Sequence, residues 1–256
     1  MHNEMVAMQK KLSAKDRLII ALDVETPGEA RERFAALRGY AGMFKIGSQL
    51  FTAAGPSIVR EIISAGARIF LDLKFHDLPN TVALAGLEAA RLGVSIFNVH
   101  AAGGSEMMRR VAAEVHEASA REGFQCPSII AVTVLTSADA GTLAETGVSY
   151  GVEQQVERLA RLAASCGMDG VVASPHEVSL VRASVERRDF LVVTPGVRPG
   201  SVSHADQKRV MTPFEAVRAG ADYLVVGRAI LQATDPAGAA EEVIREMEAA
   251  SEKETR

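Results

Sequence analysis

The sequence predicts a single-domain (β/α)8 barrel of the TIM-barrel type, in the α/β class. Eight short apolar runs alternate with longer amphipathic stretches, which is the pattern of parallel βαβ units. The chain has 256 residues, a routine length for such a barrel. No shift in composition marks a linker, and eight uninterrupted units favour a closed barrel over an open sheet.

The expected elements follow one another in a regular order. Strands are expected at residues 18–24, 43–47, 68–74, 96–100, 128–135, 170–174, 191–196 and 223–227. Helices are expected between and after them, at 28–37, 57–65, 81–92, 105–122, 153–165, 175–183, 213–219 and 236–249. Around the barrel domain, residues 16–250, we expect a polar N-terminal extension at 1–15 and a polar C-terminal tail at 251–256.

Composition and charge exclude several classes of protein. Hydrophobic residues make up 48% of the chain and charged residues 23%, which indicates a folded globular protein. The net charge of −4 does not suit a nucleic-acid-binding domain. No apolar run reaches the roughly 20 residues of a membrane span, and residues 1–15 lack the apolar segment of a signal peptide. Cys126 and Cys166 have no metal-ligand spacing, so we expect reduced cysteines and a cytoplasmic protein.

Polar and charged residues gather where the expected strands end. In barrels of this class the active site lies at the carboxyl ends of the strands. The strand-end residues in this sequence are Asp23, Lys45, Asp72 with Lys74, Asn98 with His100, residues 133–137, Ser174, residues 195–198, and Gly227 with Arg228. This convergence predicts a site at the mouth of the barrel.

Asp72 and Lys74 are the most informative of these residues. Because side chains alternate along a strand, both are predicted to point to the same face, with Leu71 and Leu73 on the opposite face. A structural ion pair that closes the barrel is one interpretation, since such charges are costly to bury unless they are paired. The further charges at Asp23 and Lys45 exceed what barrel closure requires and favour a functional site.

The sequence around this pair resembles a known enzyme family. Residues 72–81 read DLKFHDLPNT. Shorter motifs lie before and after this segment along the chain: ALD at 21–23, KIG at 45–47, NVHA at 98–101, VTVLTS at 132–137, TPGVRP at 194–199, DQKR at 206–209 and VGR at 226–228. This set resembles the orotidine 5′-monophosphate decarboxylases, in their free-standing bacterial form. The resemblance spans nearly the whole chain and implies decarboxylation of orotidine 5′-monophosphate to UMP without a metal or other cofactor.

The resemblance also implies roles for the charged residues. Lys74 is expected to stabilise the ring carbanion and protonate it, and Asp72 to lie near the departing carboxylate. Lys45 and Asp77 are expected to complete an alternating array of charges. The family places the residues that match Asp77 and Thr81 across a dimer interface, so a homodimer with shared active sites is expected.

The remaining substrate contacts follow from the same motifs. Asp23 resembles the ligand of the ribose hydroxyls, and Thr136 and Ser137 match positions near the base. The phosphate-binding residues are expected to be Arg228, the backbone of Gly227, Gln207 and Arg198. A phosphate site after strands seven and eight is a recurrent feature of barrels. The polar loop at 199–209 is the expected lid.

Other interpretations of these residues stay open at this point. Lys45 could be a surface lysine at a strand end, and Arg228 could cap a helix or pair with an acid. Either Asn80 or Thr81 could cap the third helix. The two strand-end histidines are expected to have structural roles, His76 because of its strand face and His100 as a hydrogen-bonded core residue.

Two other functions compete with the decarboxylase. Metal-dependent sugar-phosphate enzymes of the same suprafamily carry a similar Asp-x-Lys-x-x-Asp motif, but a glutamate replaces the lysine that ends their second strand. Lys45 occupies that position here and would repel a divalent cation. A non-catalytic nucleotide-phosphate binding module would need the Arg228 end but not Asp72 and Lys74.

Overall fold

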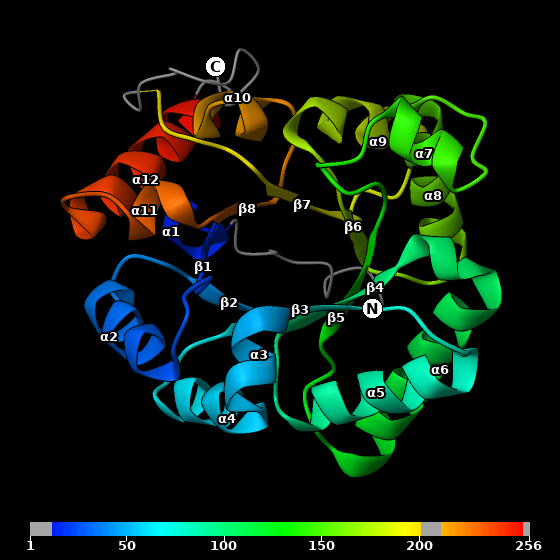
Figure 1. Ribbon diagram of the computed structural model, residues 1–256, viewed down its shortest axis with the longest axis horizontal. Coiled ribbons are helices and arrows are strands. Elements are labelled where there is room, and N and C mark those ends of the chain that lie inside the picture. The colour runs from blue at the N-terminus through cyan, green and yellow to red at the C-terminus, as the bar shows by residue number, and fades with distance from the viewer. Residues whose placement is uncertain (1–11, 201–210, 253–256) are drawn as a thin grey trace, which may run out of the picture.

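The computed structural model describes residues 12–200 and 211–252, which form one closed barrel of eight parallel strands (Figure 1). The strands pair in sequence order, and β1 pairs with both β2 and β8. The predicted (β/α)8 barrel is therefore confirmed. The domain limits expected at 15/16 and 250/251 stay a prediction.

The strands lie where the sequence places them, with ends that differ by a few residues. They are β1 Leu18–Ala21, β2 Met43–Gly47, β3 Ile69–Phe75, β4 Ile96–His100, β5 Ser128–Val132, β6 Gly170–Val172, β7 Leu191–Pro195 and β8 Tyr223–Val226. Short strands suffice because each one pairs with two neighbours in the closed barrel.

The helices form an outer ring around the strands (Figure 1). The expected helices correspond to α2 Pro27–Leu37, α4 Pro56–Ser64, α5 Pro79–Arg91, α6 Gly104–Glu122, α8 Val152–Ser165, η2 Pro175–Glu177 with α9 Val178–Ser184, α10 Pro213–Arg218 and α12 Pro236–Glu252. Five further short segments were not expected: α1 Ala14–Arg17, α3 Ser48–Ala54, η1 Ala101–Gly103, α7 Ala140–Glu145 and α11 Arg228–Leu231. Segments of three to seven residues span too few turns to show a helical period.

The barrel wall separates two apolar clusters. Alternate side chains of the strands point inward and fill the barrel with Ile19, Ala21, Met43, Phe70, Ile96, Ile130, Val193, Tyr223 and Val225. The residues between them point outward and pack under the helices in a much larger cluster. The inner cluster forms an apolar floor, and the next inward residues toward the carboxyl ends of β1, β2 and β3 are charged.

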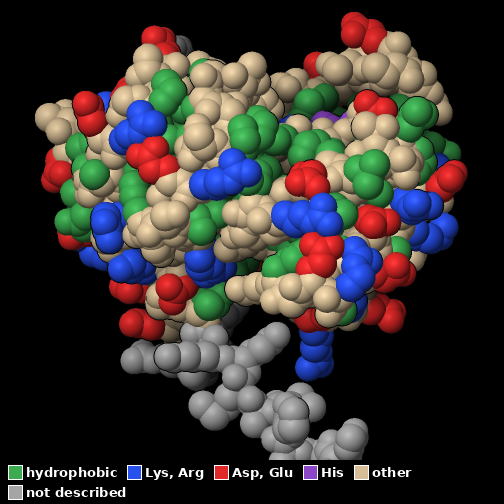
Figure 2. All heavy atoms as spheres, turned by 90° about the horizontal axis from the view of Figure 1, so that it is seen from below, with side chains coloured by type: hydrophobic (Ala, Val, Ile, Leu, Met, Phe, Trp, Pro, Cys, Tyr) green, Lys and Arg blue, Asp and Glu red, His purple; other side chains and the backbone are tan. Residues whose placement is uncertain are grey.

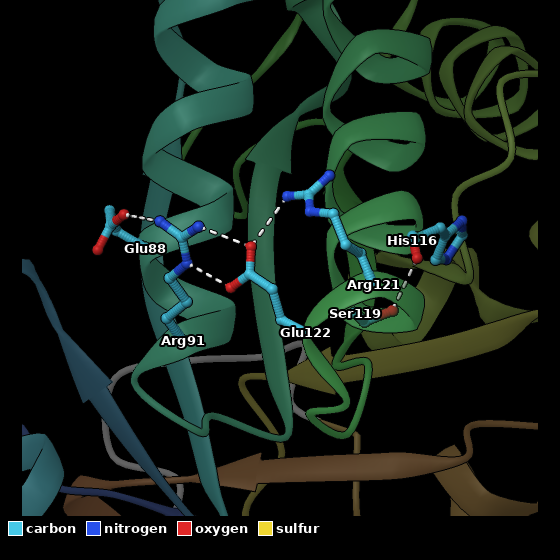
Figure 3. A network of polar contacts seen from close by, with 6 residues as sticks. All are labelled: Glu88, Arg91, His116, Ser119, Arg121 and Glu122. Atoms are coloured by element: carbon cyan, nitrogen blue, oxygen red, sulfur yellow. Dashed lines mark hydrogen bonds and ion pairs between the residues drawn. The ribbon is translucent and has the colours of Figure 1, made fainter.

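Helices α5 and α6 make close contact beside the third and fourth strands. Gly86 on α5 is buried at this contact, and a Cβ atom there would lie 2.6 Å from Val111 Cγ2 and 3.0 Å from Phe97 Cζ. At the carboxyl ends of the two helices, Arg91 binds Glu88 and Glu122 at 2.7–2.9 Å (Figure 3). These ion pairs are exposed and contribute little to stability, so apolar packing holds the two helices together.

We expect Gly86→Ala to destabilise the fold. The added methyl group would push Val111 and Phe97 away from α5, and such overpacking costs about 1–3 kcal/mol. Because Ala favours the helix over Gly, roughly 1 kcal/mol of this cost is offset. Urea unfolding measures the net change. Gly39→Ala is the control, because its Cβ would meet no atom within 4 Å, and its expected effect is within about 0.5 kcal/mol. Equal stability of the two variants would contradict this packing.

Candidate active site

Four side chains of alternating charge lie in series at the carboxyl ends of β1, β2 and β3. Lys45 Nζ lies 2.8 Å from Asp23 Oδ1 and 3.3 Å from Asp72 Oδ2. Lys74 Nζ lies 2.6 Å from the other oxygen of Asp72, Oδ1. The structure therefore joins the four residues into one array, as the strand-end pattern predicts. We call these four residues the charge array.

Exposure varies along the charge array. Lys45 and Asp72 are buried, whereas the side chains of Asp23 and Lys74 are 51% and 35% exposed. The buried middle is tolerated because each buried charge has two partners of opposite sign. Solvent reaches both ends of the array, so a ligand could contact Asp23 and Lys74. Seen from the side, the molecule is hollowed at its upper edge, and a histidine side chain lies in this hollow (Figure 2).

The backbone around the charge array leaves room for its side chains. Gly47 ends β2, and a Cβ atom there would lie 3.1 Å from Lys45 Nζ and 3.3 Å from Asp23 Oδ1. Any larger residue would crowd the ion pair between these two side chains. Glycine at this strand end therefore follows from the geometry of the site.

Strand β3 is irregular at Lys74. Its pairing with β4 shifts between Leu71 and Phe75, and Lys74 has a φ of 53°, in the left-handed region that residues other than glycine seldom adopt. The predicted meeting of Lys74 with Asp72 is confirmed, and Leu73 packs outward as expected. The regular alternation assumed for the end of this strand is replaced by a bulge, which redirects side chains.

Asn98 on β4 forms hydrogen bonds with two members of the charge array, Asp72 and Lys74. Its Oδ1 accepts a hydrogen bond from the Lys74 N–H at 2.8 Å, and its Nδ2 donates to Asp72 Oδ1 at 2.7 Å. Asn98 is completely buried. Sequence reasoning noted it at a strand end but gave it no role. Its inward position next to Asp72 is the signal that could have identified it.

The surroundings of Asp72 favour its charged form. Burial alone would raise the pKa of Asp72, but the Lys45 and Lys74 ammonium groups and the hydrogen bonds from Lys74 and Asn98 outweigh burial and hold it below the ordinary value.

The half-buried His100 ring lies 5.5 Å from that of the exposed His76. Burial, His76 and Lys74 lower the pKa of His100, which favours a neutral imidazole beside the array.

Residues 16–243 match the model of the orotidine 5'-phosphate decarboxylase / HUMPS family. The chain belongs to this family. An orotidine 5'-phosphate decarboxylase from Syntrophotalea carbinolica is 53% identical over 242 residues, 94% of this chain and 99% of the relative. One from Geobacter sulfurreducens is 53% identical over 236 residues, 91% and 97% of the two chains. The crystal structure of orotidine 5'-phosphate decarboxylase from Lactobacillus acidophilus has a TM-score of 0.79 at 35% identity and covers 90% of this chain and 98% of its own.

Two residues that the decarboxylase resemblance assigns to a neighbouring subunit lie outside the charge array. Asp77 is exposed, and its carboxylate accepts a hydrogen bond from the N–H of Leu78 at 2.6 Å. Thr81 is exposed on α5, which begins at Pro79 with Leu78 as its cap, so neither Asn80 nor Thr81 caps this helix. Lys74, Asp77 and Thr81 all line a pocket of about 330 Å³.

The expected base and phosphate residues of the decarboxylase follow other strands. Thr136 and Ser137 are exposed after β5. Arg198 is half-buried after β7, and Arg228 is exposed at the start of α11. A Cβ on Gly227 would lie 3.8 Å from Asp23 Oδ2, so the expected phosphate and ribose residues are neighbours.

Gln207 and residues 201–209 of the expected lid lie outside the described residues. Within residues 12–200 and 211–252, no helix is long and apolar enough to cross a membrane. In the same ranges, no three His, Cys, Asp or Glu side chains form a cluster that could hold a metal ion.

The lowered pKa of Asp72 predicts how stability depends on pH. A carboxyl group with a lowered folded-state pKa stabilises the fold above its unfolded value, about 4, and this contribution is lost as the pH falls through the folded value. We therefore expect the free energy of unfolding of wild type to increase relative to that of Asp72→Asn as the pH rises from about 2 to about 5. Urea unfolding at a series of pH values measures it.

Glu177 provides a control of opposite sign. It is buried after β6, and burial raises its pKa despite a hydrogen bond from the Ser174 N–H. A raised pKa gives stability that is present below the unfolded value and lost as the pH rises. Wild type should therefore lose stability relative to Glu177→Gln over rising pH. A pH-independent difference for Asp72→Asn would contradict the assigned pKa direction.

Proposed function

We propose that this chain decarboxylates orotidine 5′-monophosphate to UMP, the last step of de novo pyrimidine nucleotide biosynthesis, with Lys74 as the proton donor. The observation that carries the proposal is the charge array, which has a buried centre and places a partly exposed lysine at one end. Membership of the decarboxylase family supports the same reaction. The enzyme is a carboxy-lyase.

The reaction requires electrostatic stabilisation. The bond between ring carbon 6 and its carboxylate breaks, CO₂ leaves, and the electron pair stays on carbon 6 in the plane of the ring, outside the π system. A cation about 4 Å from this carbanion is worth roughly 4 kcal/mol at an effective dielectric of 20. Lys74 supplies that cation and then transfers a proton from Nζ to carbon 6. Its partly exposed side chain can regain a proton from solvent.

Asp72 acts mainly on Lys74 in this scheme. Its carboxylate holds Nζ of Lys74 at one oxygen and faces Lys45 with the other. Because these charges are aligned before substrate binds, little reorganisation is needed during the reaction. The departing carboxylate of the substrate would lie close to Asp72, and its loss as neutral CO₂ removes the repulsion between the two anions.

The other groups would hold the substrate away from the reacting carbon. We assign the ribose hydroxyls to Asp23 and the base to Thr136 and Ser137. The phosphate is assigned to Arg228, Gly227, Arg198 and Gln207. Arginine presents a planar fork that suits phosphate oxygens. Binding energy from this remote phosphate can order the reacting end.

We further propose a homodimer in which Asp77 and Thr81 complete the neighbouring subunit's site. Asp77 lies outside the charge array of its own chain, and its carboxylate accepts the N–H of Leu78. Two apolar side chains that follow it in the sequence, Leu78 and Leu84, are 71% and 51% exposed. Large exposed apolar side chains favour a protein contact. We place the dimer in the cytoplasm, where its free cysteines, Cys126 and Cys166, would stay reduced.

Lys45 favours the proposed reaction over the metal-dependent alternative. Its ammonium group is buried between the carboxylates of Asp23 and Asp72 at this end of the barrel. A divalent cation there would meet the lysine's charge at close range. The proposed mechanism therefore uses no cofactor.

Lys74→Ala should lower the turnover of orotidine 5′-monophosphate by more than about 1,000-fold, because one residue supplies both the cation and the proton. Affinity for UMP should change little, since the phosphate and ribose contacts lie elsewhere. Product formation and calorimetric UMP binding measure the two effects. Near-normal turnover would refute the assignment of Lys74, and loss of UMP binding would show a wider role for it.

Mixing inactive Lys74→Ala chains with inactive Asp77→Ala chains tests the shared site. A mixed dimer contains one intact site, so a random equal mixture should recover roughly a quarter of wild-type activity. Native mass spectrometry verifies that mixed dimers have formed. Mixed dimers without activity would contradict a trans contribution of Asp77.

A further inference from the structure

We propose that Asn98 is a positioning residue for this reaction: its side-chain amide holds the Asp72 carboxylate and the Lys74 backbone in one fixed arrangement. This inference rests on the proposed function, because it concerns the residue that donates the proton. Asn98 does not need to contact the substrate, since its polar atoms already face the array.

The pairing of β3 with β4 shows why a side chain is needed here. Leu71 pairs with Phe97 and Phe75 pairs with Val99, so three residues of β3 lie opposite the single residue Asn98. A bulge of this kind leaves backbone groups without a partner in the ladder. Asn98 Oδ1 accepts the Lys74 N–H and so replaces the missing backbone acceptor.

The conformation of Lys74 needs that support. A lysine with a φ of 53° costs roughly 1–3 kcal/mol and persists only where its surroundings hold it. The hydrogen bond from its N–H to Asn98 is such a restraint. The resulting turn of the backbone brings Nζ of Lys74 to Asp72, two residues earlier in the same strand.

The chemistry of the amide suits both contacts at once. Asn98 offers an acceptor to Lys74 and a donor to Asp72, and its own side chain is completely buried. Leucine has a similar size but offers neither group. Aspartate keeps the acceptor but would place a second carboxylate about as close to Asp72 as the amide nitrogen, at 2.7 Å. Two such carboxylates share a proton, which raises one pKa.

A merely structural role for Asn98 predicts a different outcome from a positioning role. If Asn98 only joins two strands, its loss lowers stability but leaves folded protein with normal kinetics. If Asn98 positions Lys74, folded protein has a lower kcat at an almost unchanged KM, because substrate binding uses other residues. Loss of its hydrogen bond to Asp72 also raises the pKa of Asp72, so the acid limb of the rate profile moves to higher pH.

The test compares Asn98→Leu, Asn98→Asp and Thr194→Val in the full-length chain. Thr194 is a buried residue on β7 outside the array, and its Oγ1 has no hydrogen-bond partner among the described residues, so Thr194→Val is a matched control. We expect kcat for orotidine 5′-monophosphate to fall about 100-fold in Asn98→Leu, the typical effect of a small misplacement of a catalytic group, with KM within a few-fold of wild type. The control should keep wild-type kinetics.

The acid limb of the pH–rate profile should move to higher pH than in wild type in both Asn98 variants, and the shift should be larger in Asn98→Asp. Wild-type kcat and an unmoved acid limb in folded Asn98→Leu would overturn the proposal. A crystal structure of Asn98→Leu gives a readout independent of activity: we expect Lys74 to leave positive φ and Nζ to move away from Asp72. If wild type itself does not convert orotidine 5′-monophosphate, the proposed function fails, while an unchanged Lys74 backbone in that crystal structure would separately refute the positioning role.

Discussion

The ion pairs of Asp72 with two ammonium groups constrain the whole site. A buried carboxylate is stable in its charged form only if cations and hydrogen-bond donors surround it, and Lys45, Lys74 and Asn98 supply them. These contacts require β2, β3 and β4 to be adjacent and in register, which the closed barrel provides. The left-handed backbone of Lys74 and the glycine at position 47 are further consequences of fitting this array into the barrel mouth.

The barrel separates stability from chemistry along its axis. Apolar side chains fill its interior, and the charged residues lie beyond them at the carboxyl ends of the strands. The large outer cluster holds the helices against the strands, so charges at the mouth can be arranged for function without weakening the core. The flank of the molecule carries acidic and basic side chains interspersed with apolar ones (Figure 2). This separation explains how one fold positions several charges whose mutual geometry the reaction requires.

The fold and most of the charge array could be predicted from the sequence, because alternation along strands determines which residues point inward. Asp23, Lys45 and Asp72 follow that rule. The bulge at Lys74 could not be predicted, since its backbone conformation depends on a contact with Asn98 that is distant in sequence. Short helices such as α3 and α7 were missed because they span too few turns to show a period. The roles proposed for Asp77 and Thr81 involve a second chain, so neither periodicity nor the single-chain geometry determines them.

In the proposed mechanism, charges of the protein alone drive the decarboxylation. The most direct measurement incubates purified protein with orotidine 5′-monophosphate and excess EDTA, and follows loss of the orotate chromophore together with CO₂ release. We predict rapid conversion to UMP at a rate that added magnesium does not change. Conversion that needs magnesium, or turnover of sugar phosphates in place of the nucleotide by folded protein, would contradict the claim.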